Sequence, residues 1–418
     1  MVLKDDKEVE KFLVDEYVYL HRFGLFYAPW DNYKRYLSAL QYIVYYTIMS
    51  YMLMSFLITA YLCIDDIAIF SQSIHIAICG VVAWTISITG LCSRNDFIMI
   101  HSTIIRDYKE FENGKILKGL RRKMEKQKKC LLIFWTCYYG FCAIIAVTIA
   151  PMVDTYLGVN PHVNVQRGVY MKLPLALWSP IDVENSTTAY IIVSLIMAGF
   201  LAISALMVSS GVIGCVFVQQ HICLQLRLLI YSIKNIEDKT VAEYNKRYLN
   251  TRKEDLYNDE KYWKCYEFCF KQNIRHHQTI IKHHKLFKNF ASIPLSVPIF
   301  SGAILLAMAG IHILSDDLRV GPKLLSFFLV FGEMLNMLML CVCGEELKQL
   351  GEDVRLAAYS IKWYDSYSQN KKFVTIMSYG ALMPLVLKAG NLVELNMPTF
   401  ATIMNSAYSY FNLIYAIK

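Results

Sequence analysis

The chain carries little charge for its length and lacks the motifs of common enzyme classes. Only 18% of its 418 residues are charged, whereas about 25% is usual in a soluble globular protein, and 56% are hydrophobic. No HExxH, GxSxG or glycine-rich phosphate-binding pattern occurs. The composition therefore predicts an integral membrane protein, and we expect no enzymatic activity, no cofactor and no metal site.

The amino-terminal stretch lacks the features of a secretory signal. The residues MVLKDDKEVEKF are polar and charged, with neither an apolar run nor a small-residue cleavage site. We expect the first membrane-spanning helix to act as the targeting signal instead.

Disulfide bonds are not expected either. The chain has 12 cysteines, yet the long connection at residues 154–188 has none. Nearly all of them fall in apolar runs or in segments predicted below to be cytoplasmic, where thiols stay reduced.

The chain has many long apolar runs. A membrane-spanning helix needs about 20 mostly apolar residues, and seven runs approach or exceed this length, the last of them amphipathic. They are Tyr36–Ile64, Ile67–Cys92, Cys130–Met152, Ala189–Val218, Phe290–Leu314, Leu324–Cys343 and Met397–Ile417. The sequence predicts an all-α membrane protein with seven transmembrane helices.

Positive charge alternates between the connections. The segment RDYKEFENGKILKGLRRKMEKQKK holds ten Lys and Arg residues and residues 219–289 hold fourteen, whereas residues 154–188 hold two. The positive-inside rule then places the N-terminus in the cytoplasm and the C-terminus outside. The net charge of +8 is explained by cytoplasmic loops that face anionic lipid, so we expect no nucleic-acid partner.

One glycosylation signal agrees with this orientation. Asn185 begins the only N-x-[ST] pattern in a connection predicted to lie outside. It lies only a few residues before the fourth apolar run, and such closeness to the membrane can prevent glycosylation.

We expect one domain, residues 1–418, with a cytoplasmic helical region, which we call the anchor region, at residues 219–289 and 345–390. Both segments keep an apolar stripe beyond the membrane runs, whereas residues 237–260 are polar and predicted to be mobile. The helical pattern continues through KKFVTIMSYGALMPLVLKAG. A continuous helix from Lys371 to Lys418 would be roughly 70 Å long, so we expect a break near Ala389-Gly390-Asn391, before a separate terminal helix at residues 396–418.

Two motifs suggest chemistry that we do not expect. In RHHQTIIKHH, the pairs His276-His277 and His283-His284 are about 10 Å apart along a helix, too far for one metal ion. We interpret them as a polar surface of a cytoplasmic helix. In CVCGEEL, the two cysteines face different sides of a helix, and we interpret them as small residues at a helix-packing interface rather than a redox pair.

Glu333 and the aromatic residues of the outer halves of the helices are candidates for a ligand site. Glu333 lies inside the sixth run, where a carboxyl group either lines a cavity or forms hydrogen bonds within the bundle. The aromatic and sulfur residues are explained either by ordinary packing or by an apolar cavity for a small hydrophobic ligand. The candidate ligand-binding residues are Phe70, Ile74, Tyr138, Tyr139, Phe141, Met197, Phe200, Phe328, Phe331 and Met334.

The terminal run carries a polar stripe at helical spacing. Thr402, Asn405 and Ser409 recur every three to four residues, and Asn412 follows them. A polar stripe is costly against lipid, so it either bonds to other helices or lines a pore formed by several copies. The stripe continues through Leu413, Ala416 and Ile417.

Several stretches resemble the insect odorant receptor family over nearly the whole chain. The most specific are LCVCGEEL followed by LAAYSIKWYD, and the ending MPLVLKAGNLVELNMPTFATIMNSAYSYFNL. RHHQTI and LPLALWSPID fit the family as well.

This resemblance implies a tetrameric ligand-gated cation channel in the plasma membrane of olfactory neurons. It implies that odorants bind in the outer part of each helix bundle, that the terminal helices line the pore, and that the anchor region joins the subunits. It also implies a hydrophobic gate at Leu413. The connection at residues 219–289 is much shorter than that of the family's co-receptor, so the chain resembles a ligand-tuned subunit that assembles with the co-receptor in a heterotetramer.

Three other classes remain as alternatives. A G-protein-coupled receptor would have the opposite orientation and an NPxxY-like run, which is missing from the last helix. A gustatory-type channel of the same superfamily shares the Tyr-rich ending. A secondary transporter is disfavoured because no internal repeat is found.

Overall fold

The computed structural model describes residues 32–110, 114–157, 168–248, 259–314, 320–361, 363 and 368–417. Residues 1–31 lie outside this range. The helices are α3 (Asn32–Leu62), α4 (Ile67–Cys92), α5 (Arg94–Glu110), α6 (Gly114–Ile144), the π-helical turn η1 (Ile145–Ile149), α7 (Ala150–Tyr156), α8 (Thr187–Lys234), α9 (Ile236–Tyr248), α10 (Glu260–Leu314), α11 (Val320–Ser360), α12 (Ser368–Gly380) and α13 (Met397–Ile417).

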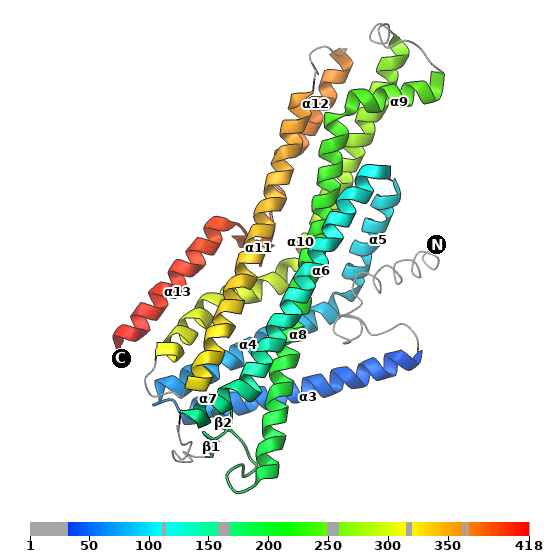
Figure 1. Cartoon of the computed structure of the whole chain (residues 1–418). Coiled ribbons are helices and arrows are strands. Elements are labelled where there is room, and N and C mark those ends of the chain that lie inside the picture. Colours follow the sequence, from blue (N-terminus) through cyan, green and yellow to red (C-terminus); the bar gives the residue numbers. More distant parts are fainter. Residues whose placement is uncertain are drawn as a thin grey trace.

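Two short antiparallel hairpins complete the described structure. In the first, β1 (Val169–Tyr170) pairs with β2 (Leu177–Trp178), and in the second, β3 (Lys388–Ala389) pairs with β4 (Val393–Glu394). The first hairpin lies at one end of the bundle, whereas α9 and α12 lie at the opposite end (Figure 1). The all-α prediction is confirmed, because both hairpins are only connections between helices.

The predicted membrane runs lie on helices, except that the first run extends two residues past the end of α3 at Leu62. Five described helices are long and apolar enough to cross a membrane, namely Ala39–Leu62 and Ile67–Cys92, and the apolar parts of α8, α10 and α11. The runs Cys130–Met152 and Met397–Ile417 are also helical, in α6 to α7 and in α13. The count of seven spans and the orientation of the termini stay predictions.

Three helices are much longer than a bilayer is thick. With 48, 55 and 41 residues, α8, α10 and α11 extend roughly 72, 82 and 62 Å, each at least twice the hydrocarbon core of about 30 Å. A helix of this length that crosses a bilayer continues beyond it, and the assignment of these continuations to an anchor region stays a prediction.

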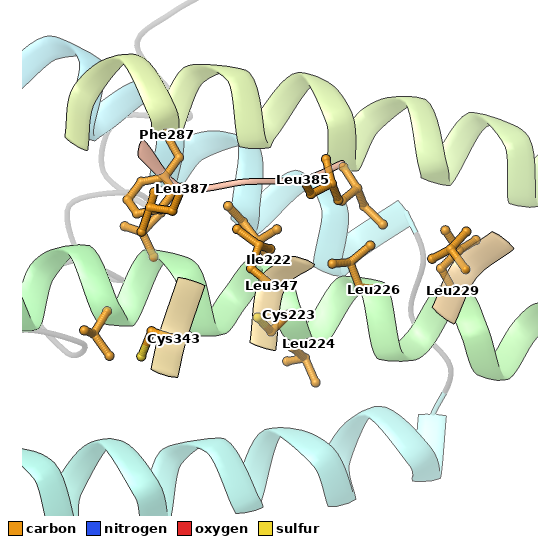
Figure 2. Close-up of a cluster of buried hydrophobic side chains, with 14 of the residues drawn as sticks. Ile222, Cys223, Leu224, Leu226, Leu229, Phe287, Cys343, Leu347, Leu385 and Leu387 are labelled. Carbon is orange, nitrogen blue, oxygen red and sulfur yellow. The ribbon is translucent and has the colours of Figure 1, made fainter. Parts of the chain in front are cut away.

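Apolar side chains of these long helices form the larger of two main buried clusters. Outside a membrane, burial of this surface from water holds the helices together, whereas within a membrane van der Waals packing does so. Figure 2 shows part of the cluster, in which α8, α10, α11 and the segment before β3 meet, through Ile222, Leu226, Leu229, Phe287, Cys343, Leu347, Leu385 and Leu387. The second cluster joins α3, α4, the first half of α8 and the connection around β1 and β2.

The helical continuation predicted through residue 390 is wrong, because α12 ends at Gly380. Pro384 lacks a backbone N–H and disfavours a helical conformation at the residue before it, so the chain leaves the helix here. The break predicted near Ala389-Gly390-Asn391 falls in the turn of the second hairpin, where Gly390 and Asn391 have φ of 57° and 59°. Residues 236–248, most of which were predicted to be mobile, form α9.

The interpretation of the four histidines as a polar surface is also wrong. His276, His277, His283 and His284 are all buried, with at most 7% of each residue exposed. This part of α10 packs against α5, α8 and α12, so it has little free surface. His276 Nε2 lies 2.8 Å from Gln225 Oε1 of α8, which shows how α10 accommodates polar rings inside the bundle.

The packing interpretation of the cysteine and glycine motif is confirmed. Cys341 and Cys343 are buried. At Gly344, a side chain would collide with the backbone carbonyl group of Leu395, so a glycine lets the segment before α13 lie directly on α11.

Helix α10 contains two prolines, Pro294 and Pro298. Proline has no N–H to donate and its ring crowds the preceding turn, so it bends a helix. Figure 1 shows α10 changing direction part-way along its length. Near this bend, Gly390 of the second hairpin donates a backbone hydrogen bond to Ser292 O at 3.1 Å.

Candidate functional site

A largely apolar cavity lies among α4, α6, α8 and α11. The volume inside it that is accessible to a water-sized molecule is about 110 Å³. Its walls are formed by Ile76, Cys79, Tyr138, Tyr139, Cys142, Ala143, Phe200, Leu201, Ser204, Ala205, Val208, Leu325, Leu329, Gly332, Glu333 and Asn336.

Polar residues directly before α4 and α8 set where these two helices of the cavity wall begin. Asp66 caps α4, because its Oδ1 accepts hydrogen bonds from the backbone N–H groups of Ala68 and Ile69 at 3.0 and 3.1 Å. Ser186 caps α8 in the same way, through Ala189 N at 3.2 Å. The caps fix where each helix begins and therefore which residues face the cavity.

A small set of polar groups interrupts the apolar wall. Asn336 Nδ2 donates to Tyr139 Oη at 2.9 Å, and Cys79 Sγ donates to Glu333 Oε1 at 3.3 Å. Tyr138 donates a hydrogen bond to the backbone carbonyl of Phe328. The cavity can thus enclose an apolar molecule and orient it through a few hydrogen bonds.

A second, smaller cavity adjoins the first. It is bounded by α4, α8, α10 and α11, and Cys79, Val208, Glu333 and Asn336 line both. Glu333, for which the sequence left two roles open, therefore both lines cavities and accepts a hydrogen bond.

The structure places the ten predicted ligand-binding residues in three groups. Tyr138, Tyr139 and Phe200 line the main cavity. Met197 is buried in the second cluster, and Phe328 packs against that cluster. The remaining five do not line the main cavity: Phe70 and Ile74 are partly buried, and Phe141, Phe331 and Met334 are exposed.

Sequence reasoning missed several lining residues. Cys79, Ser204 and Asn336 are polar residues inside apolar runs, and that signal was available. They were not predicted because the prediction relied mainly on aromatic residues.

The stripe of α13 forms a second candidate site. Thr402, Asn405, Ser409, Leu413 and Ala416 are all exposed in the described chain. On the opposite face Ile403 and Ala407 are buried, and α13 packs through that face on α10 and α11. The side chain of Ile417 lies outside the described residues.

The predicted glycosylation residue lies just before α8. Asn185 is exposed, and its Nδ2 donates to Asp182 Oδ2 at 2.7 Å. Its modification stays a prediction.

A buried polar cluster lies between α5, α6, α8 and α10. Lys128 Nζ lies 2.8 Å from His221 Nε2, and Tyr108 Oη bonds to the other ring nitrogen. His283 Nδ1 lies 3.9 Å from Asp107 Oδ2. Burial lowers the pKa of Lys128 to about 7 and raises the pKa of Asp107 to about 7, so both groups titrate near neutral pH.

The chain is similar to known proteins in sequence. A family model described as 7tm Odorant receptor matches residues 98–408. Odorant receptor 67a of Drosophila melanogaster is 25% identical over 150 residues, which are 34% of this chain and 36% of that protein. The Odorant receptor coreceptor of Aedes aegypti is 24% identical over 103 residues, 25% of this chain and 21% of that protein. The chain thus aligns with well under half the length of these relatives.

The chain is also similar to a solved structure over nearly its whole length. The insect olfactory receptor OR5 from Machilis hrabei, in complex with eugenol, has a TM-score of 0.73 and 15% identity. The match covers 99% of this chain and 100% of that one. At this identity the likeness concerns the fold.

Proposed function

The chain belongs to the 7tm odorant receptor family, and on that basis we propose that it is a subunit of an odorant-gated, non-selective cation channel. In this proposal a small hydrophobic volatile binds in the cavity among α4, α6, α8 and α11. The observation that carries the proposal is the cavity itself, in a member of this family: its wall is mostly apolar, with a few polar groups that can orient a ligand. The complex of a similar receptor with eugenol supports a small organic ligand.

Helix α13 is proposed to line the pore. Its buried face packs on its own chain, whereas the face with Thr402, Asn405 and Ser409 is exposed. Polar groups are costly against lipid, so a position towards water at the centre of several copies suits this face. Leu413 is 60% exposed on the same helix and would close the pore by excluding water when no ligand is bound.

The proposed partner is the odorant receptor co-receptor, in a heterotetramer in the plasma membrane of olfactory sensory neurons. Helices α11 and α12 form a groove whose lining includes Leu356, Tyr359 and Tyr379, all more than half exposed. Exposed apolar surface of this kind marks an interaction site, and its place in the anchor region suits contact between subunits.

The function can be tested by recording currents from cells that express the chain with and without a co-receptor, during exposure to a panel of volatiles. Leu329→Trp should fill the cavity and raise the agonist concentration needed for half-maximal current at least about tenfold, since each 1.4 kcal/mol of lost binding energy is tenfold. Phe327→Leu is the matched control, because Phe327 is exposed on the same helix and lies outside the cavity wall.

Two outcomes would contradict the proposal. One is the lack of any volatile-evoked current when the chain reaches the surface together with the co-receptor. The other is an unchanged dose–response curve for Leu329→Trp at normal surface expression.

The orientation has its own test. An epitope at the N-terminus should be reached by antibody only after cells are permeabilised, and an epitope at the C-terminus should be reached on intact cells. The reverse labelling would exclude the proposed topology.

A further inference from the structure

Three metal-binding types of side chain meet in the wall of the cavity. His75 and Cys79 are four residues apart on α4 and therefore lie on the same side of the helix, and Glu333 reaches them from α11. One ligand atom from each lies within 4.8 Å of the other two. His75 Nε2 is 3.6 Å from Glu333 Oε1, and Cys79 Sγ is 3.3 Å from the same oxygen.

The two separations that involve Glu333 Oε1 match those around a bound ion. With Zn–N and Zn–O bonds of about 2.1 Å and a Zn–S bond of about 2.3 Å, tetrahedral geometry places the ligand atoms roughly 3.4–3.6 Å apart. Little movement is needed to bring the three atoms around one centre.

The polar groups here lack other partners. His75 is 2% exposed, and neither of its ring nitrogens has a hydrogen-bond partner among the described residues. Glu333 Oε2 is buried and has no such partner either. A buried polar group without a partner is costly, so an arrangement of several requires a physical explanation.

We propose that His75, Cys79 and Glu333 form a binding site for a divalent transition-metal ion, with Zn²⁺ as its ordinary occupant. Imidazole nitrogen, thiolate sulfur and carboxylate oxygen are the three ligand types that Zn²⁺ takes in proteins. A thiolate and a carboxylate together neutralise the charge of the ion, which makes the site suitable for a low-dielectric helix bundle.

The site has an open side. Cys79 and Glu333 line the cavity. An ion can therefore reach these two side chains from the cavity, and three protein ligands leave one tetrahedral position free.

The test uses the purified full-length chain in detergent, stripped of metal with a chelator and titrated with Co²⁺ alone. We expect one Co²⁺ per chain and a thiolate-to-cobalt charge-transfer band. Cys79→Ser should abolish the band. His75→Gln and Glu333→Gln should weaken Co²⁺ binding by at least the roughly 10–100-fold that loss of an outer partner of a metal ligand costs.

Cys215→Ser is the matched control, because Cys215 is a buried thiol of α8 that lines neither cavity, and it should keep both the band and the affinity. X-ray absorption of the unmutated chain loaded with Zn²⁺ gives a measurement that does not depend on how variants fold. One sulfur neighbour with two or three nitrogen or oxygen neighbours is expected.

The inference would be overturned by a Zn²⁺ shell without sulfur, or by a cobalt band that Cys79→Ser leaves intact. Because both measurements are made on the isolated chain, their result is independent of whether odorants open a channel.

Discussion

At the scale of single residues, two hydrogen bonds in the cavity wall each join two helices. Asn336 of α11 bonds to Tyr139 of α6, and Glu333 of α11 accepts from Cys79 of α4. Within a membrane such bonds contribute about 1 kcal/mol each, so they select one packing of the helices more than they stabilise it.

The bond between Asn336 and Tyr139 can be tested by removing one partner and then both. Tyr139→Phe leaves the half-buried amide nitrogen of Asn336 without this acceptor and should reduce the stability of the purified chain by about 1–3 kcal/mol. The double variant Tyr139→Phe with Asn336→Leu should lose less than Tyr139→Phe alone, because no buried donor is left unpaired. Equal losses in thermal unfolding would show that the hydrogen bond is unimportant.

Lys128 makes a prediction about pH. Its folded pKa of about 7 is below its ordinary value of 10.5, so the unfolded chain binds more protons between these values. Its contribution to stability should therefore rise as pH increases from 7 towards 10. Lys128→Met should remove this part of the rise in Tm between pH 7 and 9.

Lys129→Met is the control for that experiment, because Lys129 is the next residue and is exposed. It should leave the dependence of Tm on pH unchanged. A wild-type Tm that responds to pH in the same way as that of Lys128→Met would contradict the assigned role of burial.

The sequence indicated which residue types form the site, but it did not indicate which of the side chains point into the cavity. Glu333 was singled out as a carboxyl inside an apolar run, and three of the predicted ligand residues, Tyr138, Tyr139 and Phe200, line the cavity. Phe331 was expected beside them, yet it is 47% exposed, while Gly332 and Glu333 line the cavity. Adjacent helical residues point about 100° apart, and only the positions of the neighbouring helices decide which of them faces inward.

At the scale of elements, α13 was predicted with the right ends and α12 was not. Asn396 Oδ1 accepts a hydrogen bond from Thr399 N at 2.9 Å, so a polar residue directly before an apolar run sets the start of α13. The extent of α12 was overestimated because the apolar pattern continues beyond Gly380 into non-helical residues that pack in the core, such as Leu385 and Leu387. A buried helix and a buried non-helical segment are both rich in apolar residues, so the apolar pattern does not distinguish them.

If α13 lines the pore, its two faces should differ in reactivity. A cysteine at Leu413 should be modified by an external thiol reagent faster when an agonist is present, and modification should block the current. A cysteine at Ala407 is the control on the buried face and should stay unreactive. Leu413→Ser should give a current without ligand.

The pore assignment would fail if cysteines at Thr402, Asn405, Ser409 and Leu413 were all inert in the open channel. The stripe would then be a surface that bonds to neighbouring helices.

At the scale of the whole molecule, the groove between α11 and α12 predicts how subunits join. Leu356 is 59% exposed on the groove, and an aspartate there would bury a charge in any interface that covers it. Leu356→Asp should reduce co-purification with the co-receptor at least about tenfold, since breaking a buried interface in this way costs several kcal/mol.

Asn245→Asp is the matched control, because it adds one negative charge at an exposed position of α9 outside the groove. It should leave co-purification unchanged. Normal complexes with Leu356→Asp would place the interface elsewhere.

The bend divides α10 into two helical segments of unequal length. At 1.5 Å per residue, the segment from Glu260 to Pro294 is roughly 50 Å long and the segment from Pro298 to Leu314 is roughly 25 Å. If α10 tilts by about 5° about the bend, the far end of the longer segment moves by roughly 4 Å and the far end of the shorter segment by roughly 2 Å. The turn of the second hairpin is bonded beside this bend, through Gly390 and Ser292, and Gly390 precedes the start of α13 by only seven residues. The bend of α10 and the start of the terminal helix are therefore joined by one short segment of chain.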